Sequence, residues 1–129
     1  AVLCTRATGQ EPATLLRRPL DELRLPSLRV NFDHANMILY DMGEPIEAIE
    51  ILGPDIAHVQ AKDANPPQTS GEWGEEVPLG DGSVGMAAFA EALAKAGYRG
   101  PLVVEREVGD QAERIAAIKH GISVLRELT

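Results

Sequence analysis

Two acidic residues, Asp33 and Glu105, come at the ends of two apolar segments of strand length. The carboxyl ends of parallel strands are where a barrel gathers its catalytic groups, and hard carboxylate oxygens suit Mg²⁺ or Mn²⁺. A divalent ion held there could polarise carbonyl and hydroxyl oxygens and stabilise the enediolate that forms when a C–H proton leaves. The alternative is that Asp33 caps a turn or helix and Glu105 is a solvated charge.

Further polar residues accompany this pair. His58, Gln60 and Lys62 alternate along the predicted strand 56–62 and therefore share one face. His58 is either a ligand deeper in the site or a hydrogen-bonded core histidine. Lys62 and Asp63 could form an ordinary ion pair at a strand end. Asn36 either binds a substrate hydroxyl or begins the next helix.

The segment from Asp63 to Gly82 is too long for a plain strand-to-helix connection, and such loops are often lids or binding loops. It contains Trp73, the only tryptophan, which either stacks on a sugar or anchors the loop. No glycine spacing matches a phosphate-binding fingerprint. His34 and His120 are predicted to be surface residues.

Apolar strand-length segments alternate with helix-period segments along the chain. Strands are predicted at 1–6, 28–33, 56–62 and 101–105. The first helix runs from about Pro12, with Pro19 expected to kink or split it. Others are predicted around Pro45 to Leu52, from a Ser83 cap to Gly97, and after a capping box of Asp110 and Glu113. The apolar positions of these helices are Leu15, Leu16, Leu20 and Leu23 in the first, Met86, Phe89 and Leu93 in the third, and Ile115, Ile118, Ile122 and Leu125 in the last.

This alternation predicts a parallel sheet with crossover helices, either an open doubly wound sheet or a barrel. One face of the second strand carries Leu28, Val30 and Phe32, and the other carries Arg29, Asn31 and Asp33. A doubly wound sheet needs apolar side chains on both faces, whereas a barrel has one polar face that opens into an active site. The pattern therefore favours the barrel.

Composition excludes several classes of protein. The 129 residues have the length of one domain, and the formal net charge of −8 makes nucleic acid a poor partner. No apolar run approaches the roughly 18 residues of a membrane span. Cys4 is the only cysteine, so we expect no disulfide framework and a cytoplasmic protein.

Four segments together resemble the bacterial sugar phosphate isomerase/epimerase family: NFDHANMILYDMGEPIEAIEILGP, HVQAKDA, EWGEEVPLGDG and GYRGPLVVEREVGDQ. The resemblance extends from about Thr8 to the C-terminus. It implies a xylose-isomerase-like barrel, of which this chain is similar to strands five to eight, and a sugar substrate. It also implies a divalent cation, Mn²⁺ or Mg²⁺, held by Glu, Asp, His and Glu at four strand ends.

Residue by residue, the resemblance places the metal ligands at Asp33 and Glu105, with Glu105 also a base. It also implies that Lys62 and Asp63 lie near the substrate, which is the alternative to an ordinary ion pair. The expected histidine falls on Gln60, whose neutral amide oxygen is a weaker ligand, and the other expected glutamate falls on Ala7. Loss of one member of an acid–base pair removes a factor of about 10²–10⁴ in rate. Two hypotheses therefore stay open: a metal-assisted ketose isomerase or epimerase, and a catalytically silent half-barrel scaffold.

The predicted domain is a single (β/α)₄ half barrel over residues 1–129. Four strands cannot close a barrel, and the first and last would have unpaired edges. We therefore expect association, either as a homodimer in which each first strand pairs with the other copy's last strand, or with a complementary half barrel.

Overall fold

Four parallel strands form the main sheet of the computed structural model, which describes residues 3–7 and 11–128, with side chains from residue 11 onward. The strands are β1 (Leu3–Ala7), β2 (Leu28–Asp33), β3 (Ile56–Ala61) and β6 (Leu102–Val104), in the spatial order β1-β2-β3-β6. The parallel sheet predicted from the alternation of elements is confirmed. Of the first predicted strand, Ala1 and Val2 lie outside the described residues.

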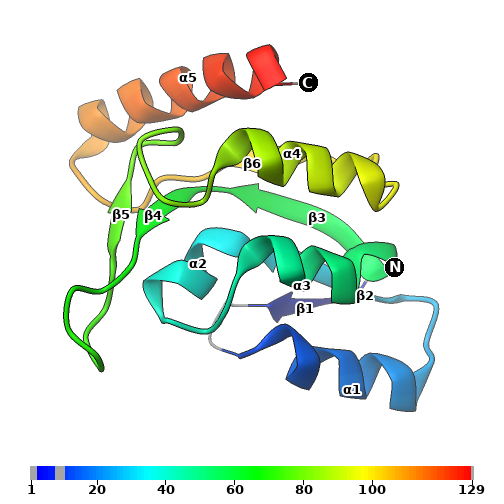
Figure 1. Cartoon of the computed structure of the whole chain (residues 1–129). Helices are drawn as coiled ribbons and strands as arrows, with labels where there is room; N and C mark the ends of the chain where they lie inside the picture. Colours follow the sequence, from blue (N-terminus) through cyan, green and yellow to red (C-terminus); the bar gives the residue numbers. More distant parts are fainter. Residues whose placement is uncertain (1–2, 8–10, 129) are drawn as a thin grey trace.

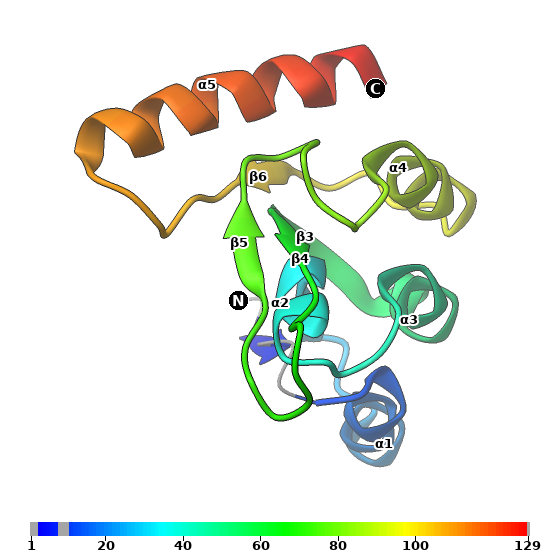
Figure 2. The same cartoon turned by 60° about the vertical axis from the view of Figure 1, so that its left-hand side comes forward.

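The three crossover helices and the C-terminal helix lie on one side of this sheet. They are α1 (Ala13–Leu23), α3 (Pro45–Leu52), α4 (Met86–Lys95) and α5 (Gln111–Leu128). Figure 1 shows them in chain order from α1 to α5, and in Figure 2 they follow one another in an arc around the strands. Neighbours in this arc pack together, α1 with α3, α3 with α4 and α4 with α5. The result is the wall of half a (β/α)₈ barrel.

The core lies between the sheet and this arc. Val30 and Phe32 of β2 and Val59 and Ala61 of β3 are at most 1% exposed. Alternate residues of a strand point to opposite faces, so these four side chains point towards the helices while their neighbours point the other way. The helices meet them with buried apolar residues, among them Leu16, Leu20, Ile49, Leu52, Phe89 and Leu93. The side-chain alternation predicted from the sequence is confirmed.

The predicted start of α4 is wrong, and of the two outcomes predicted for Pro19 the split does not occur. Helix α1 runs unbroken from Ala13 to Leu23, and Arg24, with φ +46°, is its C-cap. Burial of Leu16 and Leu20 against the rest of the arc holds the helix together despite the hydrogen bond that proline removes. Ser83 does not cap α4, because the N-cap is Gly85 and the Ser83 hydroxyl donates to Asn65 Oδ1 at 2.9 Å.

The start of α5 follows the prediction. The backbone N–H of Asp110 donates to Glu113 Oε2 at 2.8 Å, and the Glu113 N–H donates to Asp110 Oδ1 at 2.9 Å. These reciprocal bonds form a capping box. The apolar face predicted for this helix is only partly covered, since Leu125 is buried but Ile115 and Ile122 are exposed.

Four short elements were not predicted. Helix α2 (His34–Leu39) follows β2 directly, and the 3₁₀ turn η1 (Gly53–Asp55) precedes β3. The segment predicted as a plain loop from Asp63 to Gly82 contains β4 (Asp63–Asn65) and β5 (Glu75–Val77), which pair antiparallel. In the described part of the chain, no helix is both long enough and apolar enough to cross a lipid bilayer.

Candidate active site

The carboxyl ends of β2, β3 and β6 bring the candidate residues to one edge of the sheet. Asp33 is the last residue of β2, Lys62 follows the last residue of β3, and Glu105 follows the last residue of β6. The β3 and β6 strands are thus one residue shorter at this end than the predicted segments 56–62 and 101–105. Parallel pairing places Asp33 opposite Gln60, and Ala61 opposite Val104. Side chains far apart in sequence therefore meet here.

Lys62 is the centre of an ion cluster that we call the Lys62 cluster, composed of Lys62, Asp33, Glu105 and Glu107. The Lys62 ammonium lies 3.4 Å from Asp33 Oδ2, 3.2 Å from Glu105 Oε2 and 2.8 Å from Glu107 Oε2. The Lys62 side chain is 1% exposed and that of Asp33 is 4% exposed, whereas Glu105 is 30% exposed. A buried ammonium is retained in a fold only when it is paired, as it is here.

The cluster shifts the proton affinities of its buried members. Burial raises the pKa of Asp33 from 3.8 to about 6, although Lys62 and the Asn36 N–H act to lower it. Burial alone would lower the pKa of Lys62, but the carboxylates of Asp33, Glu107 and Glu105 outweigh it, and the pKa lies above its ordinary value. Lys62 is therefore a permanent cation near neutral pH.

Asp33 has a second role at the start of α2. Its Oδ1 accepts a hydrogen bond from the Asn36 N–H at 3.1 Å, which caps the helix. The two readings of Asp33 from the sequence are therefore compatible, because one oxygen caps α2 while the other faces Lys62. Asn36 lies in the first turn of α2, which agrees with the alternative that it begins the next helix, and it is half-buried.

A polar chain of Asn31, His58 and Gln60 lies one step further from the strand ends. Nδ1 of His58 is 2.6 Å from Asn31 Oδ1, and Asn31 Nδ2 donates to Gln60 Oε1 at 3.3 Å. A carbonyl oxygen accepts, so His58 carries its proton on Nδ1 in this arrangement. These contacts confirm that the polar residues of β2 and β3 share the face away from the helices.

Glu76 and Arg106, which were not predicted as site residues, stabilise the loop after β6. Glu76 Oε1 of β5 accepts from Arg106 Nη1 at 3.1 Å and from the Glu107 N–H at 3.0 Å. Glu76 is 7% exposed, so this carboxylate is a buried acceptor. It fixes the segment that carries Glu105 and Glu107 to the β4–β5 ribbon.

Asp63 organises the backbone instead of facing the Lys62 cluster. Its carboxylate accepts hydrogen bonds from four backbone N–H groups, those of Ala64, Gly80, Gly82 and Val84, at 2.9–3.2 Å. A Cβ atom at Gly82 would collide with this carboxylate, so the loop requires glycine there. Substrate binding by Asp63 stays an untested prediction, and no contact among the described residues favours it.

Trp73 lies apart from these contacts. Its side chain is 76% exposed and packs edge-on against Tyr40, with ring centroids 5.4 Å apart. Tyr40, Asp41, Met42, Gly71, Glu72 and Trp73 line a shallow groove. The predicted stacking of Trp73 on a sugar stays a prediction.

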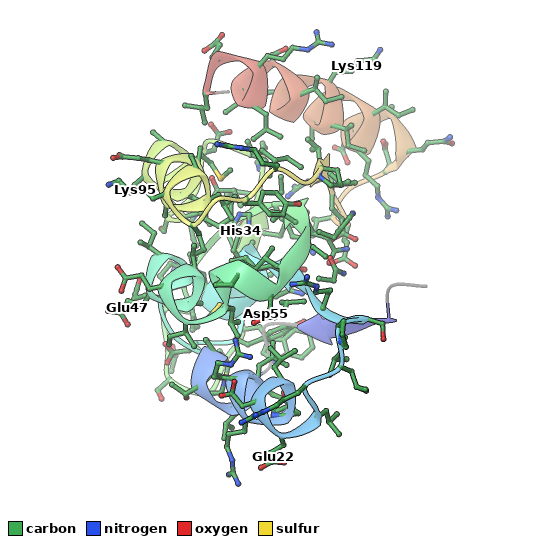
Figure 3. All side chains as sticks on the ribbon, turned by 90° about the vertical axis from the view of Figure 1, so that its right-hand side faces the viewer. Glu22, His34, Glu47, Asp55, Lys95 and Lys119 are labelled. Atoms are coloured by element: carbon green, nitrogen blue, oxygen red, sulfur yellow. The ribbon has the colours of Figure 1, made fainter. Side chains whose placement is uncertain are left out.

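His34 is inside the protein, so its prediction as a surface residue is wrong. The residue is 0% exposed, and Figure 3 shows it in the interior, away from the labelled charged side chains of the outer helices. Its ring lies 3.8 Å from that of Phe89 and 6.2 Å from that of Phe32, measured between centroids. Neither ring nitrogen has hydrogen-bond geometry with a described group, and burial lowers its pKa to about 3 although the Lys62 backbone acts to raise it. His120 is exposed, as predicted.

The residues at this edge do not fit a divalent ion as they are arranged. Mg²⁺ takes about six oxygen ligands at roughly 2.0–2.1 Å. Asp33 and Glu105 offer carboxylates, but the Lys62 ammonium lies against both of them, and the Gln60 oxygen already accepts from Asn31. Among the described residues, no three His, Cys, Asp or Glu side chains gather so that they could hold a metal.

Comparison with known proteins gives a consistent picture. Residues 6–128 match the family model described as "Xylose isomerase-like TIM barrel". A xylose isomerase domain protein from Planctomyces limnophilus is 39% identical, with a TM-score of 0.88 over 98% of this chain and 45% of that chain. None of the curated proteins compared with the chain matches it.

Two further solved structures share the fold. A xylose isomerase-like TIM barrel protein from Mycobacterium smegmatis, in complex with magnesium, is 15% identical, with a TM-score of 0.74 over 91% of this chain and 39% of that chain. The probable 3-DHS dehydratase AsbF from Bacillus anthracis is 18% identical, with a TM-score of 0.67 over 97% of this chain and 48% of that chain. The present chain spans less than half the length of each of these three structures.

Proposed function

Because this chain belongs to the xylose isomerase-like TIM barrel family, we propose that its strand-end edge is the proton-transfer half of a sugar isomerase or epimerase site. The substrate class is a ketose or a related polyhydroxy carbonyl compound. The observation that carries the proposal is the Lys62 cluster, in which two carboxylates from β2 and β6, the strands on either side of β3, face one fixed cation. The choice of reaction rests on the family to which the chain belongs.

Glu105 is the residue to which we assign proton transfer. It is 30% exposed and can meet a substrate, while Asp33 is enclosed and already caps α2. In the proposed reaction a Glu105 oxygen takes the proton from the carbon next to the carbonyl, leaving an enediolate. Glu105, which exchanges its proton with solvent while the enediolate is bound, then protonates the former carbonyl carbon. The proton of the adjacent hydroxyl passes to the former carbonyl oxygen, which completes an isomerisation. The Lys62 charge lies close enough to favour the anionic intermediate.

The polar chain of Asn31, His58 and Gln60 offers the hydrogen-bonding groups that sugar hydroxyls require. It lies on the same face of the sheet as Glu105 and contains both donors and acceptors. We propose that it orients the substrate, together with Asn36 at the start of α2. Trp73 is a proposed outer contact for a sugar ring on the exposed groove beside Tyr40.

A Mn²⁺ or Mg²⁺ ion, as expected from the resemblance, would have Asp33, Glu105 and Gln60 as its donors and would act as a Lewis acid. It would need Lys62 to leave the space between the two carboxylates. The related protein from Mycobacterium smegmatis is a magnesium complex, which supports a test for metal. The proton transfer proposed here uses the chain's own groups.

Exchange of substrate hydrogen with solvent tests this proposal. The protein is incubated in D₂O with a panel of ketoses and ketose phosphates, and deuterium next to the carbonyl is measured by NMR. We expect exchange with wild type and its loss in Glu105→Gln, while Glu47→Gln, which changes an exposed carboxylate of α3, keeps it. Absence of exchange across the panel in a folded wild-type chain would overturn the proposal.

A second candidate function is a catalytically silent half barrel that assembles. Ala7 stands where the resemblance expects a glutamate, and exposed apolar side chains lie at both ends of the sheet. Leu15, Leu23 and Leu25 are exposed around α1 beside β1, and Val103, Ile115 and Ile122 are exposed around β6 and α5. Such surfaces usually mark an interface.

We propose a second copy of this chain as the occupant of these surfaces. β1 and β6 are the two edges of one parallel sheet. A two-fold axis would place β1 of each copy beside β6 of the other, so both edges and both apolar surfaces would be covered at once. A complementary half barrel would cover them too, and a chain that stays monomeric would favour that occupant.

A further inference from the structure

We infer that Lys62 is a built-in cation, which takes the place of a divalent metal between Asp33 and Glu105. The chain would therefore hold this edge of the sheet together without Mg²⁺ or Mn²⁺, through a fixed ammonium in place of a metal ion. This inference goes beyond the proposed function. It concerns which cation the chain uses at this edge, and it applies whether or not the chain turns over a substrate.

The position of the ammonium is the first argument. Lys62 Nζ lies within 3.4 Å of carboxylate oxygens from the ends of two different strands, Asp33 after β2 and Glu105 after β6. These are the two carboxylates that a divalent ion at this edge would need. A metal ion bound to both would lie close to the ammonium, and two cations of like sign repel each other.

Burial is the second argument. The Lys62 side chain is 1% exposed, so both its four-carbon stem and its ammonium are shielded from solvent. Lysine is rarely buried to this extent without paired carboxylates. Withdrawal of the ammonium would break three ion pairs, to Asp33, Glu105 and Glu107. The ammonium is therefore a fixture of the cluster.

The third argument is Glu107, which has no counterpart in the ligand set implied by the resemblance. Its carboxylate accepts the shortest of the three contacts of the Lys62 ammonium, at 2.8 Å. Its backbone N–H is held by Glu76, a buried carboxylate of β5. The loop after β6 is thus anchored so that it supplies a third carboxylate to the lysine.

The remaining donors agree with this assignment. Gln60 has an amide where an imidazole is expected, and its oxygen accepts from Asn31. Ala7 has no ligand atom. Two of the expected metal ligands are absent, and a buried ammonium lies between the other two. Both observations agree with a lysine in the place of a divalent ion.

The test is Mn²⁺ binding, measured through the electron paramagnetic resonance signal of the free ion. Wild type should show no stoichiometric binding, while Lys62→Met, which keeps the length of the side chain without its charge, should bind Mn²⁺ at least about tenfold more tightly because the carboxylates are freed. Lys95→Met, at an exposed lysine of α4 paired with Glu91, is the matched control and should behave as wild type.

Each outcome decides the inference. Tight Mn²⁺ binding by wild type would overturn it, and so would a folded Lys62→Met protein that gains no affinity. If Lys62→Met does not fold, Lys62→Gln replaces it, since the amide keeps hydrogen bonds to the carboxylates without the charge. If neither folds, the wild-type measurement decides alone. Since the readout is metal binding, a failure here is separate from a failure of the hydrogen-exchange experiment.

Discussion

The ammonium of Lys62 lies 3.4 Å from the Asp33 carboxylate, and the two side chains are only 1% and 4% exposed. Asp33 closes β2 and Lys62 follows β3, so their pairing also connects the ends of two strands. Such a pair gives little net stability compared with apolar residues of the same size, but removing one partner leaves an uncompensated buried charge.

Lys62→Met should therefore destabilise the protein by about 3 kcal/mol at pH 8. The cost should shrink below pH 6, because Asp33, with a pKa of about 6, then takes up a proton and no longer needs a cation. Chemical denaturation at the two pH values measures both effects. Lys95→Met removes an exposed lysine and should change stability little. Equal costs of Lys62→Met at pH 5 and pH 8 would contradict the role of Asp33.

His34 should make the protein less stable in acid. Its pKa is about 3 in the folded state against 6.5 for the free side chain, because burial disfavours the charged ring. Between these values the unfolded state binds more protons, so stability falls as the pH falls. The contribution lost between pH 8 and pH 5 is about 2 kcal/mol. Asp33, with its raised pKa, acts in the opposite direction, since its contribution is present at low pH and is lost as the pH rises through about 6.

The variant His34→Leu isolates the histidine effect. Its unfolding free energy, compared with that of wild type at each pH, should lose the acid-side decline attributed to His34 while keeping the effect of Asp33. His120→Leu, on the exposed part of α5, controls for the loss of a histidine as such. An unchanged pH dependence in His34→Leu would show that the ring is accessible to protons in the folded protein.

The sheet and its polar face could be predicted because each depends on a local alternation. β2 and β3 alternate apolar and polar residues, so the shared face of Asn31, His58 and Gln60 follows from the period of a strand. The capping box of α5 was predictable for the same reason, since its two residues are three positions apart.

The rest depends on contacts between distant residues. Lys62 meets Glu107 across 45 residues, and Glu107 lies in a segment without periodicity. His34 is buried because it packs on Phe89 of α4, which no local pattern near His34 reveals. Helix α2 has six residues and β4 and β5 have three each, too short for a period to appear.

Asp63→Asn should disorder the loop between β5 and α4. The Asp63 carboxylate accepts four backbone N–H bonds, and an amide has only one oxygen to offer. We expect a loss of about 3 kcal/mol and faster amide hydrogen exchange at Gly80, Gly82 and Val84. Asp81→Asn, at an exposed position of the same loop, should change neither. Slow exchange retained in Asp63→Asn would mean that other contacts hold the loop.

Association through the sheet edges predicts the effect of a charge on α5. Ile122 is 40% exposed and lines the groove between β6 and α5, where the proposed second copy would bury it. Ile122→Glu would place a carboxylate in that apolar contact, and an unpaired buried charge costs several kcal/mol. We expect wild type to be a dimer at low micromolar concentration and Ile122→Glu a monomer, by light scattering after size-exclusion chromatography.

Ile46→Glu, at a similarly exposed isoleucine of α3 away from both edges, should remain a dimer. A monomeric wild type, or a variant at Ile46 that dissociates as readily as that at Ile122, would contradict closure of the barrel by a second copy.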